Sequence, residues 1–331
     1  MADKTKIFVS TTPFGAVNSR PRELFCKTGW EIVYNTTQHK LSSEEVALMA
    51  REVDGIVAGT EDLGPLMAAN PRLKIISRVG IGLDSVPLAE CQKRGIAVCY
   101  TPDAVTMAVA EFTIGAMIAT TRYFGPVDRM IRRGAWQRPQ GIRLGEAMIG
   151  LVGFGRIGSN VARLLLPFHP RAVLVNDIKD KSKEIAGMRE RGLAIESATL
   201  GRILSAVDIL SLHVPLSRQT RLLIGARELA KMKPNAVLLN TARGGLVDEV
   251  ALHRALAAGS LACAAIDVFE REPYRGPLAE LDNVQLTAHL GSCSIDCRAR
   301  MEIEATEDLI RFFRGEPLRN KVPQEEYEWQ L

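Results

Sequence analysis

Short apolar runs alternate with amphipathic stretches along the first hundred residues of the chain. The runs KIFVS, EIVYN, GIVAG, KIISRVG and GIAVCYT each have the length and apolar content of a buried strand. Between them, SSEEVALMAREV and SVPLAECQKRG carry apolar residues at helical spacing, and the former opens on a serine suited to an N-cap. This alternation predicts a mainly parallel sheet with helices on both faces.

The same alternation returns in the second half of the chain. A long helix is predicted near residues 103–124, its start marked by Pro102 and Asp103, and the polar stretch RRGAWQRPQGIRLGE follows it. Strand-like runs then resume as MIGLVGF, AVLVND, VDILSLHV, AVLLNT, LACAAIDVF and VQLTAH, with helices between them. A final helical pattern, SIDCRARMEIEATEDLIRFFRGEP, leads into a polar tail. The pattern therefore predicts an α/β fold of two doubly wound, parallel-sheet units.

Composition and charge are those of two ordinary globular domains. Of the 331 residues, 47% are apolar and 24% are charged. The net charge of +4 comes from 42 basic and 38 acidic residues with no block of like charges, so we expect neither a nucleic acid nor a membrane surface as a partner. The N-terminus has no apolar stretch of signal-peptide length, and Glu111 interrupts the longest apolar run. We expect a cytoplasmic protein without a transmembrane span.

The six cysteines do not indicate a metal site. They are scattered along the chain, and although Cys293 and Cys297 form C-x-x-x-C, no second Cys or His pair is placed to complete a zinc site. We therefore expect reduced thiols and no bound metal.

The most informative single motif is a glycine series between an apolar strand and a helix start. Gly153, Gly155 and Gly158 form G-x-G-x-x-G almost halfway along the chain. In the dinucleotide-binding fingerprint such glycines allow a tight turn, approach of the pyrophosphate and close packing of the helix. The N–H groups of Arg156 and Ile157 would then meet the phosphates at the positive end of the helix. A glycine-rich turn without a ligand is the alternative.

Asp177 indicates which dinucleotide is bound. It ends the next predicted strand, 19 residues after Gly158, where a carboxylate can accept hydrogen bonds from the adenosine ribose. The same charge would repel a 2′-phosphate, so NAD is favoured over NADP. Lys179, Lys181 and Lys183 follow closely and could weaken this preference, although a solvated helix start also explains them.

Candidate catalytic groups follow three predicted strands of the second unit, where ligands of doubly wound sheets bind. They are Arg243 in NTARGG, a carboxylate among Asp267, Glu270 and Glu272 in AAIDVFEREP, and His289 in LTAHLG. An arginine can hold a carboxylate and polarise a neighbouring carbonyl, and a histidine can exchange the hydroxyl proton of a hydroxyl–carbonyl redox reaction. Each residue also has a purely structural interpretation. Arg243 could form an ion pair with Asp248, Glu272 could be an ordinary loop carboxylate, and His289 could be a structural histidine.

The motifs, and the order in which they follow one another along the chain, resemble those of the NAD-dependent D-isomer-specific 2-hydroxyacid dehydrogenases, particularly the 3-phosphoglycerate dehydrogenase-like branch. The resemblance covers nearly the whole chain. SRVGIGLDSVPLAECQKRGIAVCYTPDAVTMAVAE is similar to the family's substrate-loop region. GLVGFGRIG, DILSLHVPLSRQTRLLIG, MKPNAVLLNTARGGLVDE, AAIDVFEREP and LTAHLGS match further family motifs in the right order.

The resemblance implies a fold and a domain division. A Rossmann NAD-binding domain, residues 102–292, would be inserted into a flavodoxin-like substrate-binding domain formed by residues 1–101 and 293–331. The active site would lie in the cleft between these domains. The enzyme would be a homodimer joined largely through the NAD-binding domain.

The family pattern also implies roles for individual residues. Arg243 would bind and polarise a 2-hydroxy or 2-oxo acid, Glu272 would tune the histidine, and His289 would be the acid–base. Besides the glycine loop and Asp177, the cofactor would lie along Thr101, Val214, Pro215, Thr241 and Asp267. The backbone around Val79 and Gly80 would meet the substrate carboxylate.

Arg78 is the one residue that indicates which chemical group the substrate carries at the end away from its 2-hydroxy acid group. In phosphoglycerate-oxidising relatives a basic residue at the matching place can meet a second anionic group, so a dianion such as 3-phosphoglycerate is a hypothesis. A charged residue at a strand end is the alternative. Glycerate, lactate, phosphonolactate and sulfolactate are further candidate hydroxy acids.

Two functions of other classes remain open at this point. Some relatives use this scaffold as a corepressor that senses NAD(H), and retention of the catalytic residues does not exclude that function. The similarly folded adenosylhomocysteinases are hydrolases that hold NAD tightly. A purified protein that already carries NAD, with no net cofactor turnover, would indicate the hydrolase.

Overall fold

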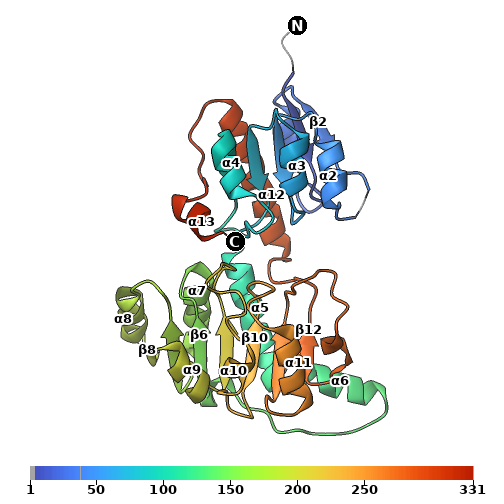
Figure 1. The fold of residues 1–331 in the computed structure, drawn as a ribbon. Coiled ribbons are helices and arrows are strands. Elements are labelled where there is room, and N and C mark those ends of the chain that lie inside the picture. The colour runs from blue at the N-terminus through green and yellow to red at the C-terminus, as the bar shows by residue number, and fades with distance from the viewer. Residues whose placement is uncertain (1–3, 38, 331) are drawn as a thin grey trace. The chain divides into compact units, whose positions relative to one another are not determined.

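The chain forms two compact units in the computed structural model, which describes residues 4–37 and 39–330 (Figure 1). Unit 1 consists of Met1–Val105 and Cys293–Leu331, and unit 2 of Thr106–Ser292. The chain thus leaves unit 1, forms unit 2 and returns. The assignment of substrate and cofactor to separate units stays a prediction.

Unit 1 contains a five-stranded sheet in which every neighbouring pair is parallel. The strand order β2-β1-β3-β4-β5 is the flavodoxin-like order, with its switch point between β1 and β3. The strands are β1 (Lys6–Val9), β2 (Glu31–Tyr34), β3 (Gly55–Ala58), β4 (Ile75–Arg78) and β5 (Ala97–Cys99). The helices are α1 (Arg20–Cys26), α2 (Ser43–Met49), α3 (Gly64–Ala69), α4 (Leu88–Arg94), α12 (Ile295–Phe313) and α13 (Gln324–Trp329).

Helices α2, α3 and α4 bury their apolar residues in one cluster with β3 and β4, and α12 packs against β4. Helix α2 begins with the expected serine cap: Ser42 and Glu45 form a reciprocal capping box. The C-terminal segment is more than the polar tail that the sequence predicts. It contains α13, and the Gln330 amide donates to the backbone oxygens of Leu83 and Val86. These contacts hold the segment against the start of α4, because Gln330 also accepts from Leu88 N.

Unit 2 contains a seven-stranded sheet, also parallel throughout, in the order β12-β11-β10-β9-β6-β7-β8. This is the Rossmann order with one added edge strand. The strands are β6 (Met148–Val152), β7 (Ala172–Asn176), β8 (Ile195–Ser197), β9 (Ile209–Leu212), β10 (Val237–Asn240), β11 (Cys263–Ile266) and β12 (Val284–Leu286). The α-helices are α5 (Thr106–Thr121), α6 (Phe124–Arg132), α7 (Arg156–Leu165), α8 (Ser182–Glu190), α9 (Leu200–Ala206), α10 (Ala226–Leu229) and α11 (Glu249–Ala257). Short 3₁₀ turns cover Leu144–Glu146, Leu166–Phe168 and Pro277–Glu280.

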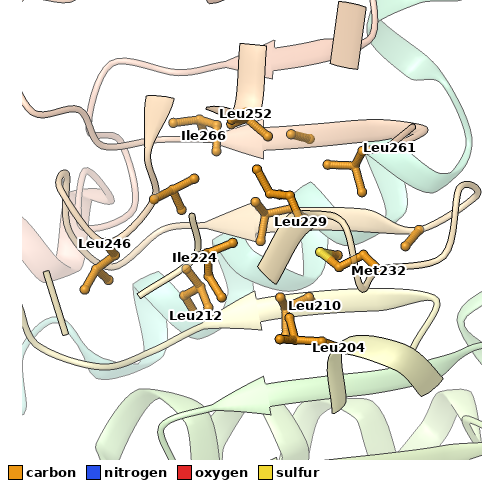
Figure 2. Packing of buried hydrophobic residues seen from close by; sticks show 14 of the residues in the cluster. Leu204, Leu210, Leu212, Ile224, Leu229, Met232, Leu246, Leu252, Leu261 and Ile266 are labelled. Carbon is orange, nitrogen blue, oxygen red and sulfur yellow. The ribbon is translucent and has the colours of Figure 1, made fainter. Parts of the chain in front are cut away.

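Each face of this sheet has its own buried cluster. Residues from α9, α10 and α11, such as Leu204, Leu229 and Leu252, cover one face (Figure 2). Residues from α5, α7 and α8 cover the other. Neighbouring strand residues point to opposite faces, so Leu238 joins the first cluster and Leu239 the second. The predicted doubly wound fold is confirmed for both units.

Several element boundaries differ from the prediction. The long helix starts at Thr106 and ends at Thr121 rather than covering residues 103–124. Tyr123 adopts a left-handed backbone (φ 56°) that stops it, and α6 begins directly afterwards. Strand β8 is too short and polar for its pattern to indicate a strand. In the described part of the chain, no helix is long and apolar enough to cross a membrane.

Candidate active site

The functional candidates of unit 2 follow the carboxyl ends of its strands. The glycine loop follows β6, and His213–Pro215 follow β9, its neighbour across the switch point of the sheet. Thr241–Gly245 follow β10, and the segments with Glu272 and His289 follow β11 and β12. One edge of the sheet therefore carries all of these loops.

The glycine loop has the shape required for a pyrophosphate. Gly153 has φ 96°, and a Cβ there would lie 2.6 Å from the His213 carbonyl oxygen. A Cβ on Gly158 would collide with the Gly153 carbonyl oxygen, whereas nothing lies within 4 Å of a Cβ on Gly155. The N-cap residue of α7 is Gly155, which has no side chain to cap the helix that begins at Arg156. The helix N-terminus behind an open glycine thus fits a phosphate group.

Asp177 braces this loop. Its Oδ2 accepts a hydrogen bond from Phe154 N (2.6 Å), and its Oδ1 accepts one from Lys179 N (2.8 Å). Beside it lies a cavity of about 280 Å³. The cavity is lined by Val175, Asp177, Ile178, Lys179, Asp180, Lys181, Ser182 and Ser197. Lys181 pairs with Glu184 (3.2 Å) at the start of α8, and 18% of its side chain is exposed. A carboxylate next to a cavity at this strand end fits an adenosine ribose.

Arg243 lies in a loop held by Asn240, a residue that the sequence analysis did not single out. The Asn240 amide donates to Arg243 O (2.8 Å) and accepts from Ala242 N (3.2 Å). Arg243 is half-buried, and its Nη1 donates to Ala242 O (2.6 Å). Thr241 is buried, with its Oγ1 3.0 Å from Thr113 Oγ1. The asparagine between strand and loop was the available signal for this brace.

Glu272 and His289 are brought together from segments that follow different strands. His289 Nδ1 lies 3.1 and 3.2 Å from the two carboxylate oxygens of Glu272. The side chains are 38% and 30% exposed, and Glu272 Oε1 also accepts from Phe269 N (3.2 Å). The carboxylate favours the tautomer with hydrogen on Nδ1, in which Nε2 carries the lone pair of the ring.

Asp267, which follows β11, is buried against the loop that carries His289, and 1% of its surface is exposed. Its carboxylate accepts from Thr287 Oγ1 (2.6 Å), Leu290 N (2.8 Å) and Gly291 N (2.9 Å). Its backbone oxygen accepts from His289 N (2.8 Å). These four bonds fix the backbone of His289, which has φ 55°. The sequence predicts Asp267 along the cofactor and does not predict this bracing.

His213, which lies in DILSLHVPLSRQTRLLIG, is a further residue of the site that the sequence pattern does not single out. Its backbone packs against Gly153, and its Nε2 lies 2.9 Å from Ser211 Oγ. Burial of the ring lowers the pKa of His213 to about 4, so the imidazole is neutral at pH 7. Val214 and Pro215, which follow it, remain partly accessible at the edge of the sheet.

The remaining predicted residues lie in unit 1, at the carboxyl ends of β4 and β5. Arg78 is buried (6% exposed), and its Nη1 donates to the carbonyl oxygen of Val79. Val79 N donates to Ala58 O (2.9 Å), and Gly80 N to Thr101 Oγ1 (2.8 Å). Thr101 thus braces the loop after β4, and the N–H groups of Val79 and Gly80 are used within the unit.

Comparison with known proteins gives consistent matches. Residues 114–291 match the model described as "D-isomer specific 2-hydroxyacid dehydrogenase, NAD binding domain". A glyoxylate reductase of Thermofilum pendens is 40% identical over 298 residues, 86% of either chain. A hydroxypyruvate reductase of Thermotoga maritima is 34% identical over 284 residues, 83% of this chain and 90% of that protein.

Solved structures agree with these matches. The crystal structure of D-lactate dehydrogenase from Aquifex aeolicus, complexed with NAD and lactic acid, has a TM-score of 0.83 and 25% identity. The alignment covers 96% of this chain and all of that one. The expected oxidoreductase class and NAD as cofactor are confirmed, whereas the corepressor and hydrolase alternatives are not favoured. The chain belongs to the D-isomer specific 2-hydroxyacid dehydrogenase family.

Proposed function

We propose that the protein interconverts small 2-oxo acids and their D-2-hydroxy acids, with glyoxylate and hydroxypyruvate as substrates for reduction. Relatives that are 34–40% identical over most of the chain bear the names of these reductases. The observation that carries the proposal is the Glu272–His289 pair, with both oxygens within 3.2 Å of Nδ1. An oriented imidazole is what proton transfer to a substrate oxygen requires.

His289 is the proposed acid–base. Its Nε2 gives a proton to the oxygen of the 2-oxo group during reduction and takes it back during oxidation. Glu272 holds the imidazole in one orientation and tautomer through Nδ1. The backbone bond from His289 N to Asp267 O keeps this arrangement in place.

The substrate carboxylate is the proposed ligand of Arg243 and of the loop that begins with Val79 and Gly80. An arginine fork can bind a carboxylate in bidentate fashion and polarise the adjacent carbonyl. Arg78 belongs to this group through its bond to the Val79 carbonyl. Its direct contact with a second anionic group, as in 3-phosphoglycerate, is the finer alternative.

NAD is the proposed ligand of Gly153, Gly155, Arg156, Ile157, Gly158 and Asp177, with Thr101, Val214, Pro215 and Thr241 along the remainder of the cofactor. The carboxylate of Asp267 accepts its hydrogen bonds from Thr287, Leu290 and Gly291, so its proposed role is to brace the His289 loop beside the cofactor. The glycine N-cap of α7 and the open side of Gly155 support the phosphate contacts. When bound, the nicotinamide supplies or accepts the hydride. The protein's own groups bind, orient and exchange the proton.

A homodimer in the cytoplasm completes the proposal. Three large apolar side chains of residues 124–136 are exposed: Phe124 (59%), Ile131 (48%) and Trp136 (81%). Helix α6 buries none of its residues in the chain, so a second copy is a suitable cover for this segment. Light scattering of the purified protein, compared with a Trp136→Ser variant, tests the dimer.

The activity is tested by following the absorbance of the reduced nicotinamide. Glyoxylate and hydroxypyruvate are offered with NADH or NADPH, and D- and L-glycerate and D- and L-lactate with NAD. Oxidation of NADH by both oxo acids, with reverse activity confined to D-isomers, is the expected result. Tight NADH binding without turnover of any oxo acid would refute the proposal.

A further inference from the structure

Three neighbouring strands of unit 1 end beside one another. Strands β1, β3 and β4 are adjacent in the sheet, and Ser10, Gly59 and Val79 directly follow them. Ser10 N donates to Val57 O (3.0 Å), and Val79 N donates to Ala58 O (2.9 Å). The pairing therefore continues past the strands and keeps these segments at the spacing of neighbouring strands, about 5 Å.

This edge also contains a buried carboxylate, Glu61, which belongs to neither the proposed catalytic residues nor the proposed cofactor-binding residues. Glu61 is 4% exposed, and its Oε1 accepts from Ser10 Oγ and from Gly59 N (3.1 Å). Ser10 is itself buried (2% exposed), and its carbonyl oxygen accepts from Asn35 Nδ2 (2.9 Å). The carboxylate is thus fixed from two strand ends rather than mobile at the surface.

The second oxygen of Glu61 remains available. Among residues 4–37 and 39–330, no donor makes a hydrogen bond to Oε2. Burying a carboxylate is costly unless its oxygens are hydrogen-bonded, and a ligand hydroxyl would supply the missing donor. A neutral hydroxyl suits this position, whereas a phosphate would meet a like charge.

We propose that Glu61 determines substrate specificity by accepting, at Oε2, a hydrogen bond from the 3-hydroxyl group of a 3-hydroxy-2-oxo acid such as hydroxypyruvate. The inference rests on the proposed function, in which the substrate carboxylate binds the loop starting at Val79 and Gly80. That loop follows β4, the neighbour of the strand before Glu61. Glu61 then favours hydroxypyruvate over glyoxylate, which has no such hydroxyl, and disfavours the 3-phosphorylated analogue.

The test compares kcat/KM for glyoxylate, hydroxypyruvate and 3-phosphohydroxypyruvate with NADH in the full-length protein. Glu61→Ala should lower the hydroxypyruvate-to-glyoxylate ratio about 10- to 100-fold, the usual effect of losing a hydrogen bond to a charged acceptor. Glu61→Gln removes the charge with little change of shape, so it should raise the phosphorylated-to-hydroxylated ratio about 10-fold or more. Both changes should appear mainly in KM, because the reacting atoms are not touched.

Two further variants separate specificity from folding. Asp62→Asn removes a neighbouring exposed carboxylate, which accepts from Gly64 N (2.9 Å), and should leave both ratios unchanged. Ser10→Ala keeps the carboxylate but removes one of its anchors, so the hydroxypyruvate-to-glyoxylate ratio should fall about 3- to 10-fold. This variant also decides the question if Glu61→Ala does not fold.

The possible outcomes distinguish the two proposals. Wild-type protein that reduces glyoxylate and hydroxypyruvate, with ratios that stay within twofold in folded Glu61→Gln and Ser10→Ala variants, overturns the role of Glu61 alone. A wild-type preference for 3-phosphohydroxypyruvate also overturns it and favours Arg78 as an anion contact. Wild-type protein that reduces none of the three acids overturns the proposed function and this inference together.

Discussion

Replacing Asp267 by asparagine tests how the active-site loop is held. The carboxylate accepts three hydrogen bonds from Thr287, Leu290 and Gly291 while almost completely buried. An asparagine side chain keeps one acceptor oxygen but directs an NH₂ group at a donor on the other side. At least one buried N–H then loses its acceptor, and a charged hydrogen bond is lost with it.

The expected cost of Asp267→Asn is about 3 kcal/mol, since a hydrogen bond to a charged group contributes roughly 1.5–3 kcal/mol and an unsatisfied buried donor adds to the loss. For a unit of this size, that free energy lowers the melting temperature by about 6–12 °C. The same loop carries His289, so losing a hydrogen bond should displace the imidazole slightly. Small displacements of reacting groups slow catalysis strongly, and we expect kcat to fall about 10- to 100-fold. The KM for NADH should change less than about threefold.

Thermal unfolding followed by circular dichroism and steady-state kinetics measure both effects. Asp282→Asn is the matched control in the same unit, because Asp282 is 73% exposed and pairs with Arg129 (3.0 Å) at the surface. It should cost less than about 1 kcal/mol. Unchanged stability of Asp267→Asn together with a large rise in the KM for NADH would refute the bracing role and favour a direct cofactor contact.

Three further predictions concern the proton, the cofactor and pH. His289→Gln should lower kcat by about two to four orders of magnitude while a fluorescence titration gives an unchanged Kd for NADH; near-normal turnover would assign the proton transfer to another group. Gly158→Ala should weaken NADH binding more than 10-fold, because a Cβ meets the Gly153 carbonyl, whereas Gly187→Ala, with nothing within 4 Å of its Cβ, should not change it. His213 takes up a proton near pH 6.5 when unfolded but only near pH 4 when folded, so it should destabilise the protein by about 2 kcal/mol between pH 7 and pH 5. Urea unfolding at both pH values measures this loss, and a wild-type pH dependence equal to that of His213→Gln would contradict it.

Much of the architecture is visible in local patterns. Parallel strands buried on both faces read as short continuous apolar runs, and helices between them show apolar residues at helical spacing. For this reason eleven of the twelve strands could be recognised directly from runs such as KIFVS, AVLLNT and GIAVCYT, while the short polar β8 could not. The glycine loop was also evident, because the backbone turn and the close approach at Gly153 and Gly158 exclude other residues locally.

Contacts between distant segments left no such trace. The pattern near Asp267 suggests a ligand contact, but the carboxylate is saturated by a loop that starts 20 residues later. Ser10 and Glu61 are 51 positions apart and meet only because β1 and β3 pair in the sheet. Hydrophobic periodicity reports which face of an element is buried, whereas the partner of a buried polar group depends on strand order and loop paths. The type of fold and the family motifs can therefore be predicted from the sequence alone. The hydrogen bonds that position His289 and Glu61 depend on the strand order, so they become apparent only in the tertiary structure.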